Sequence, residues 1–326
     1  MAAVVLLSMS VVWVLGPYRP DLRDPASIGS DSSNYYAAGQ RLDDGHDLYA
    51  LRSSDRPVAN GTSPSPWAYP LLSPPPIAVL WRVLALIPGD IAMYLWWLGG
   101  AVSSLLFGYW LILRLHPPQL GIAILLLPSL GITAFSGNVN AWLIPLCGLV
   151  WIADRQGRFA SAGLGVAAAA ILKLTPGLYG WWLVGQGHRR AVASAIAGFV
   201  IGLVVTIVGA GMSSLAMYPS VAANATSIGL SPLSSVSVVS SLGLAAGAAT
   251  LSPYVIAVAA AALAYGFRRR PDLSFVFCAI GVALGTPAVR FETLAWLLLA
   301  LVPWAYQGAS RLAGPREASE ASFTEA

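Results

Sequence analysis

The chain has 326 residues, of which 57% are hydrophobic and 10% charged, and its formal net charge is +4. A soluble globular domain carries about a quarter of its residues as charges, so this composition excludes that class and indicates an integral membrane protein. Apolar runs such as "VIAVAAAALAYGF" lack the period-two alternation of a membrane β-barrel. We therefore expect an all-α polytopic protein with about 9 to 12 transmembrane helices. We expect these helices to form a single domain, residues 1–310, followed by a disordered cytoplasmic tail at residues 311–326.

The first 16 residues, "MAAVVLLSMSVVWVLG", lack the basic start and the cleavage site of a signal peptide, so they are expected to be a retained span. A polar loop follows at residues 17–70 and holds seven of the fourteen acidic residues. Within it, "DSSNYYAAGQRLDDGHDLYAL" predicts a short amphipathic helix that begins at Asp31 and is broken at Gly45. The proline cluster after this loop predicts a half-span or re-entrant element at about residues 72–87.

Arginine is concentrated in a few of the breaks between later apolar runs. The positive-inside bias places these basic breaks in the cytoplasm: residues 154–158, 187–190, 268–270 and the tail. The sparsely basic breaks then face the opposite side together with the acidic loop: residues 135–140, 173–177, 211–236 and 285–292. The polar residues of these breaks should therefore lie at one extracytoplasmic end of the protein.

Ionisable side chains at buried span ends are costly and mark a candidate site. The candidates at this end, with two amides, are Asp31, Lys173, Arg290, Glu292, Asn138 and Asn140. Lys173 is the only lysine among 18 basic residues and stands in the apolar "AAAAILKLTPG". A carboxylate beside cations suits group transfer from an anionic lipid-linked donor. The carboxylate would take a proton from the acceptor hydroxyl while the cations stabilise the leaving phosphate.

Each candidate also has a structural interpretation. Asp31 could cap the loop helix, and Lys173 could extend its ammonium to the membrane surface. The Gly-Asn pair before Asn140 is ordinary turn chemistry. Arg290 and Glu292 could pair with each other at the start of the last span.

Cysteine and histidine suggest no further chemistry. Cys147 and Cys278 stand in apolar runs without a partner motif and are expected to be core residues. The three histidines, His46, His116 and His188, are scattered, which argues against a metal site.

The order of the short motifs resembles glycosyltransferase family 87. The succession runs from Asp31 through "DGHDLY", the proline-rich "WAYPLLSPPP", "GNVN" and "LKLTP" to a late "GTP", over roughly residues 28–307. Members of this family are polyprenyl-phosphate-mannose-dependent mannosyltransferases of actinobacteria, with arabinofuranosyltransferase relatives, in the GT-C structural class. Several carry Trp-x-His-His just after the late Ser-Pro, where this chain reads "TPAVRFE".

The resemblance implies an enzyme of the cell membrane whose active site faces the extracytoplasmic side. Its donor would be a polyprenyl-phosphate sugar, most simply mannose, and its acceptor an envelope glycolipid or glycan. Beyond this lipid-linked co-substrate and membrane lipids, no cofactor, metal or nucleic acid is implied. Asp31 would be the general base, and Lys173 would hold the donor phosphate together with Arg290, which stands near the missing histidines. The expected substrate-binding residues are Tyr35, Tyr36, Tyr69, Asn138, Asn140 and Glu292.

Two other classes of protein remain open on the sequence alone. A transporter or lipid flippase would use Lys173, Arg290 and Glu292 to line a pathway open to both sides, and many such proteins carry inverted repeats. A non-catalytic scaffold would not need an acidic loop opposite a single lysine. The enzyme interpretation requires Asp31, Lys173 and Arg290 to face one outward cavity.

Overall fold

A computed structural model describes residues 30–49, 71, 73–225, 241–243, 246–286 and 291–312. All regular secondary structure in these ranges is helical, as the sequence predicts. The predictions for the first span, for Tyr69 and Arg290, and for the tail beyond residue 312 lie outside them. The described helices are α3 (Ser30–Asp43), α4 (Pro75–Leu84), α5 (Gly89–Arg114), α6 (Pro117–Phe135), α7 (Asn140–Arg155), α8 (Phe159–Leu172), α9 (Leu178–Gln186), α10 (Arg189–Ala225), α12 (Ala246–Gly266), α13 (Pro271–Leu284) and α14 (Val302–Leu312), with 3₁₀ segments at Thr175–Gly177 and Phe291–Leu301.

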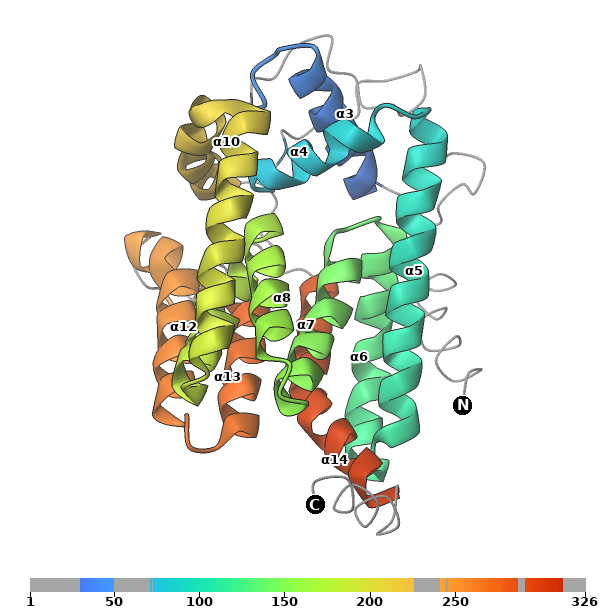
Figure 1. Cartoon of the computed structure of the whole chain (residues 1–326), viewed down its shortest axis with the longest axis vertical. Helices are drawn as coiled ribbons and strands as arrows, with labels where there is room; N and C mark the ends of the chain where they lie inside the picture. Colours follow the sequence, from blue (N-terminus) through green and yellow to red (C-terminus); the bar gives the residue numbers. More distant parts are fainter. Residues whose placement is uncertain are drawn as a thin grey trace, which may run out of the picture.

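Three of the described helices are long and apolar enough to cross a membrane: α5, α6 and α10 as far as Ala222. Shorter apolar helices complete the bundle, and among them α8 runs beside α10 (Figure 1). On α10, Ile201, Val204 and Val208 are more than half exposed. An apolar surface of this kind fits lipid chains and not water, so the structure agrees with the membrane protein that the composition predicts.

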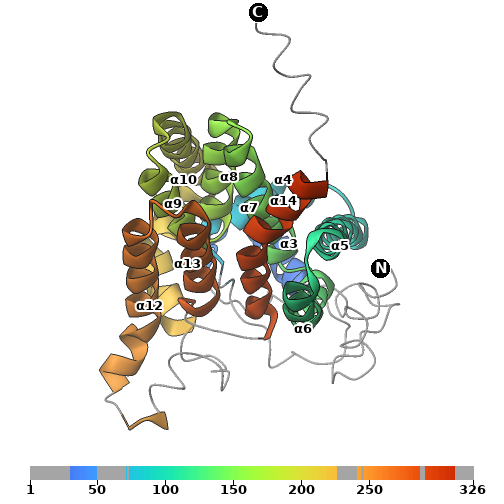
Figure 2. The same cartoon turned by 90° about the horizontal axis from the view of Figure 1, so that it is seen from below.

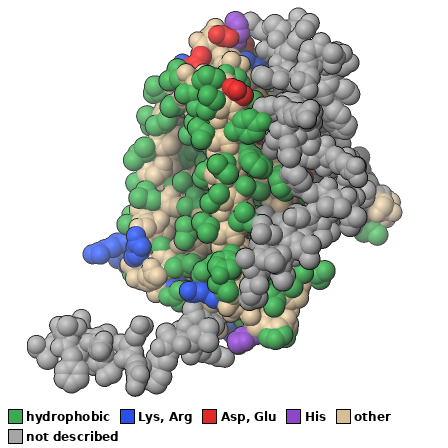
Figure 3. Space-filling view, turned by 90° about the vertical axis from the view of Figure 1, so that its right-hand side faces the viewer, with side chains coloured by type: hydrophobic (Ala, Val, Ile, Leu, Met, Phe, Trp, Pro, Cys, Tyr) green, Lys and Arg blue, Asp and Glu red, His purple; other side chains and the backbone are tan. Residues whose placement is uncertain are grey.

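The bundle has two chemically different ends. One, at the top of Figure 1, carries α3 and α4, and we call it the loop end. The other carries Arg155 at the end of α7, Arg189 at the start of α10 and Arg268 after α12, and we call it the arginine end. Figure 3 shows acidic side chains gathered at the loop end and basic side chains toward the arginine end.

Helix α4 stands where the sequence predicts a half-span or re-entrant element after the polar loop. Its ten residues measure about 15 Å, half of the roughly 30 Å of hydrocarbon in a bilayer. It begins at Pro75, where the missing proline N–H costs no helical hydrogen bond, and it buries Ile77, Ala78 and Trp81. The helix lies across the loop end (Figure 1). Between residues 73 and 114, α5 alone is therefore long enough to cross.

The core is rich in aromatic side chains and centres on α7. In Figure 2, α7 lies between α5 and α6 on one side and α10 and α12 on the other. Trp151 of α7 packs against Trp182 and Phe275, with ring centroids 5.4 and 4.8 Å away. Cys147 and Cys278 are buried and free, so the expectation that they are core residues is confirmed.

Candidate functional site at the loop end

Asp31 lies in the first turn of α3 and is tied to the turn between α6 and α7. Its backbone N–H donates to the carbonyl of Ser136 at 2.9 Å. Its carboxylate oxygen Oδ2 accepts a hydrogen bond from Asn138 Nδ2 at 2.8 Å, across 107 residues of sequence. The start of the loop helix is thus anchored on the bundle, and the amphipathic helix predicted to begin at Asp31 is α3.

The α6–α7 turn sets the direction of the Asn138 side chain. Gly137 has φ of 65°, a left-handed conformation that favours glycine, and Trp96 Nε1 donates to its carbonyl at 2.8 Å. Asn138 Oδ1 accepts from the Asn140 backbone N–H at 2.9 Å, so its amide nitrogen is left facing Asp31. The "GNVN" segment is therefore a tight turn, and that turn aims an amide at the candidate base.

Lys173 follows the last residue of α8 and reaches the same turn. Its backbone is extended, with φ −154° and ψ 121°, and its Nζ donates to Asn140 Oδ1 at 2.9 Å. Asn140 is 1% exposed, so the ammonium is bonded to a buried side chain. The ammonium also interacts favourably with the charges of Glu292 and Asp31. A hydrogen-bonded chain therefore runs from Asp31 through both asparagines to Lys173, which we call the loop-end chain.

Glu292 joins the site from the last part of the sequence. It lies in the 3₁₀ segment that begins at Phe291, and its backbone carbonyl accepts a hydrogen bond from Thr133 Oγ1 of α6 at 3.1 Å. Its negative charge, like that of Asp31, favours the charged form of Lys173. The lysine thus interacts with two carboxylates from opposite ends of the chain.

The two tyrosines of α3 have different surroundings. Tyr35 is 4% exposed, and its phenol lies near the Ser73 side chain and the Val139 backbone. Burial raises the pKa of Tyr35 far above its usual range, and the nearby charges of Asp31 and Glu292 raise it further, so the hydroxyl keeps its proton.

Tyr36 contributes to packing between helices. Its ring lies edge-on to Trp81 of α4, with centroids 6.4 Å apart, and its hydroxyl accepts a hydrogen bond from Gln40. A Cβ at Gly89, the first residue of α5, would come within 2.8 Å of the ring. The structure therefore brings Tyr35 to the loop-end chain and places Tyr36 where α3, α4 and α5 meet.

Two buried polar atoms of these segments have no hydrogen-bond partner within the described ranges. They are Asn140 Nδ2, next to the atom that binds Lys173, and Thr175 Oγ1, two residues beyond that lysine. An unpaired buried donor costs about 1–3 kcal/mol, so such groups are expected to meet a ligand or water. The asparagine offers a donor for an oxygen-rich ligand. No group of three His, Cys, Asp or Glu side chains able to hold a metal comes together in the described ranges.

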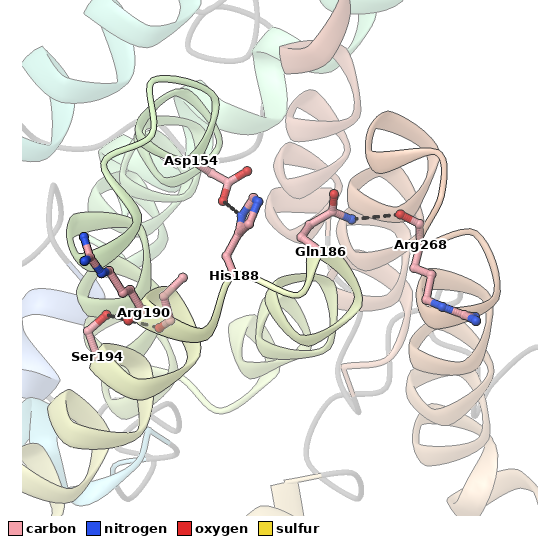
Figure 4. Close-up of polar contacts among 7 residues, drawn as sticks. Asp154, Gln186, His188, Arg190, Ser194 and Arg268 are labelled. Atoms are coloured by element: carbon pink, nitrogen blue, oxygen red, sulfur yellow. Dashed lines mark hydrogen bonds and ion pairs between the residues drawn. The ribbon is translucent and has the colours of Figure 1, made fainter.

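The arginine end holds a second set of polar pairs (Figure 4). His188 Nδ1 lies 2.7 Å from Asp154 Oδ1, and the aspartate side chain is 1% exposed. Asp272 accepts a hydrogen bond from Gln307 and lies 3.5 Å from Arg155. These groups lie at the opposite end of the bundle from the loop-end chain.

Comparison with known proteins identifies the family. The family model for glycosyltransferase family 87 matches residues 71–289, well over half of the chain. The chain belongs to glycosyltransferase family 87. It is therefore a membrane glycosyltransferase, as the motif order predicts. No curated protein and no solved structure matches it.

The matched range includes some of the loop-end chain. Asn138, Asn140 and Lys173 lie within it, whereas Asp31 and Glu292 lie outside it. Asp31 joins the site through its hydrogen bond from Asn138, and Glu292 through the effect of its charge on Lys173. Sequence reasoning missed Trp96 and Thr133, whose side chains hold the turn and the 3₁₀ segment. A buried tryptophan or threonine in an apolar run has no distinguishing pattern, so no sequence signal could have found them.

Proposed function

We propose that this glycosyltransferase moves a mannosyl residue from a polyprenyl-phosphate donor to a cell-envelope glycolipid or glycan. The observation that carries the proposal is the loop-end chain, which joins the carboxylate of Asp31 to the ammonium of Lys173 through two asparagines. A proton acceptor and a phosphate-binding cation are the two groups that transfer from a sugar phosphate requires. Family membership supports glycosyl transfer, and the choice of mannose follows the resemblance described above.

The proposed reaction is a single displacement with inversion. Asp31 removes the proton from an acceptor hydroxyl, whose oxygen then forms a bond to the anomeric carbon of the donor sugar. The bond between that carbon and the phosphate oxygen breaks, and both of its electrons leave with the polyprenyl phosphate. The Asn138 amide holds the carboxylate in place for the attack.

Lys173 offsets the charge that develops on the leaving phosphate. A well-placed oxyanion donor is worth about 3 kcal/mol in other enzymes, and an ammonium in a partly buried site fits that role. The unpartnered Nδ2 of Asn140 adds a neutral donor beside it. Such groups can perform the charge neutralisation that a metal ion supplies elsewhere, so we propose a reaction without a metal or other cofactor.

We place the loop end on the extracytoplasmic side of a multi-pass protein. The support is the concentration of arginines at the opposite end, which the positive-inside bias assigns to the cytoplasm. Lys173 then lies at the outward end of the apolar helix α8. A donor phosphate could meet it there while the polyprenyl tail stays in the bilayer.

A transfer assay tests the proposal. The full-length protein in liposomes is given an envelope lipid extract as acceptor and, in separate reactions, radiolabelled polyprenyl-phosphate mannose, polyprenyl-phosphate arabinose or a nucleotide-linked mannose. We expect labelled product from the first donor alone. Product from the arabinose donor alone would correct the sugar to arabinofuranose. Product only from the nucleotide sugar, or movement of the lipid donor across the bilayer without product, would overturn the proposal.

A further inference from the structure

Arg82 connects three helices at the loop end. It lies near the end of α4, and its Nε donates to Asp43 Oδ1, at the end of α3, at 2.8 Å. Its Nη1 donates to the carbonyl of Gly209 in α10, also at 2.8 Å. The arginine and aspartate side chains are 37% and 35% exposed. A partly exposed ion pair alone contributes little, so the bond to the α10 backbone is the informative contact.

The Gly209 carbonyl lies just before a break in α10. Gly211 has φ of 78° and ψ of 159°, which interrupts the helix. Carbonyls in the last turn before such a break lose their usual backbone partners. Two side chains bond to carbonyls next to this break: Ser214 Oγ donates to the carbonyl of Ala210 at 2.7 Å, and Arg82 Nη1 donates to that of Gly209 at 2.8 Å. A cation is also favoured at the carbonyl end of a helix.

Helices α4 and α10 touch closely at this point. A Cβ at Gly209 would come within 2.5 Å of the Val79 side chain. Nearer its start, α10 packs equally closely on α8, because a Cβ at Gly202 would lie 2.5 Å from the Ile171 side chain. Helix α8 leads directly into Lys173. Arg82 therefore bonds α3, which carries Asp31, to α10, which packs against the helix that positions Lys173.

We propose that Arg82 is a positioning residue that fixes α3 against α10 and thereby sets the geometry between Asp31 and Lys173. It acts at the far end of α3 from Asp31 and needs no contact with substrate. Its kinetic consequence rests on the proposed function, whereas its effect on the arrangement of the helices does not. The experiment therefore measures the reaction kinetics and, separately, the distance between the helices.

The kinetic measurement compares Arg82→Gln and Arg82→Lys with wild type in the liposome assay, corrected for folded protein. Because misplacing catalytic groups by about 1 Å can cost about a hundredfold in rate, we expect kcat to fall about ten- to a hundredfold in Arg82→Gln with little change in donor KM. Arg82→Lys keeps the positive charge but loses the planar guanidinium, whose N–H groups can donate to two acceptors at once. We therefore expect its kcat to lie between those of Arg82→Gln and wild type. The matched control is Arg114→Gln, which removes an arginine over the Trp110 ring at the arginine end. An unchanged kcat in Arg82→Gln would overturn the proposal.

The structural measurement needs no activity. Spin labels are placed on cysteines at Gln40 of α3 and Leu174 beside Lys173, both exposed, while the native cysteines are buried. Pulsed electron paramagnetic resonance then gives the distribution of distances between α3 and the end of α8. We expect a broader or shifted distribution in Arg82→Gln than in wild type, and no change in Arg114→Gln. If Arg82→Gln does not fold, Arg82→Lys takes its place and a smaller broadening is expected. An unchanged distribution in the folded variant would refute the proposal, and an inactive wild-type protein would refute only the proposed function.

Discussion

The loop end and the arginine end each hold an aspartate that is at least partly buried, but the surroundings of the two carboxylates differ. At the loop end, Asp31 is linked through Asn138 and Asn140 to Lys173, and the linkage leaves the buried Nδ2 of Asn140 without a partner in the described part of the chain. At the arginine end, Asp154 meets His188 in a direct pair between the end of α7 and the residue before α10 (Figure 4). We interpret the first arrangement as a site prepared for a ligand and the second as a contact that stabilises helix packing.

Replacing the loop-end acid should have the largest effect on activity. In Asp31→Asn the amide can still accept the hydrogen bond from Asn138, so α3 should stay anchored while the proton acceptor is lost. Since a general base contributes about 10²–10⁴-fold, we expect kcat to fall by that factor. Rates per folded protein in the liposome assay measure this. Retained wild-type rates would remove Asp31 from the mechanism.

Replacing the lysine should have the next largest effect. Lys173→Met keeps an unbranched apolar side chain but removes the charge beside the leaving phosphate. Loss of one oxyanion donor lowers rates by about 10²–10³-fold in other enzymes, and we expect a fall in that range. A lysine that only extended toward the membrane surface would leave donor use nearly unchanged, and that outcome would contradict its assignment to the phosphate.

The unpartnered amide group of Asn140 offers a finer test. Asn140→Asp keeps an oxygen for Lys173 but replaces the free donor with a second negative oxygen. A donor phosphate would be repelled there, and a loss of about 1.4 kcal/mol in binding corresponds to a tenfold rise in donor KM. Initial rates across donor concentrations give the value. If KM is unchanged, the amide does not face the phosphate.

The smallest effect on activity is expected at the arginine end. Asp154→Asn weakens the contact with His188, so the free energy of unfolding should fall by about 1–3 kcal/mol. Its kcat per folded protein should stay within about twofold of wild type, because the pair lies at the other end of the bundle. Thermal denaturation in detergent, combined with the same transfer assay, separates the two quantities. A large loss of kcat in the folded variant would show that the two ends are coupled.

Sequence alone placed the candidate residues at one end but could not give their contacts. The arginine distribution assigns Asn138, Asn140 and Lys173 to the same end as the acidic loop that holds Asp31, and the order of the motifs agrees. Both of these signals can be taken from the sequence alone. The orientation of each amide depends on hydrogen bonds within the turn, notably that from the Asn140 backbone to Asn138 Oδ1. The bonds from Asn138 to Asp31 and from Lys173 to Asn140 form only after α3 and α8 have packed against the α6–α7 turn.

Arg82 shows a different limit of the sequence interpretation. It stands in the apolar run "IAVLWRVLALI", where an ionisable residue is itself a signal, but it lies outside the polar breaks between the apolar runs. Its acceptor on α10 is the backbone carbonyl of Gly209, just before the break at Gly211. Nothing in the residues around position 82 indicates which helix that carbonyl belongs to, or that Asp43 lies beside it.

The most direct test of the account compares Asp31→Asn with Asp154→Asn in one experiment. Both variants are reconstituted in the same liposomes at equal folded fractions, and kcat is measured with the lipid-linked donor that the wild type uses. The account predicts that the first variant loses at least about a hundredfold in kcat while the second stays near wild type. Equal losses in the two variants, or a larger loss in Asp154→Asn, would contradict the claim that the loop end is the active site.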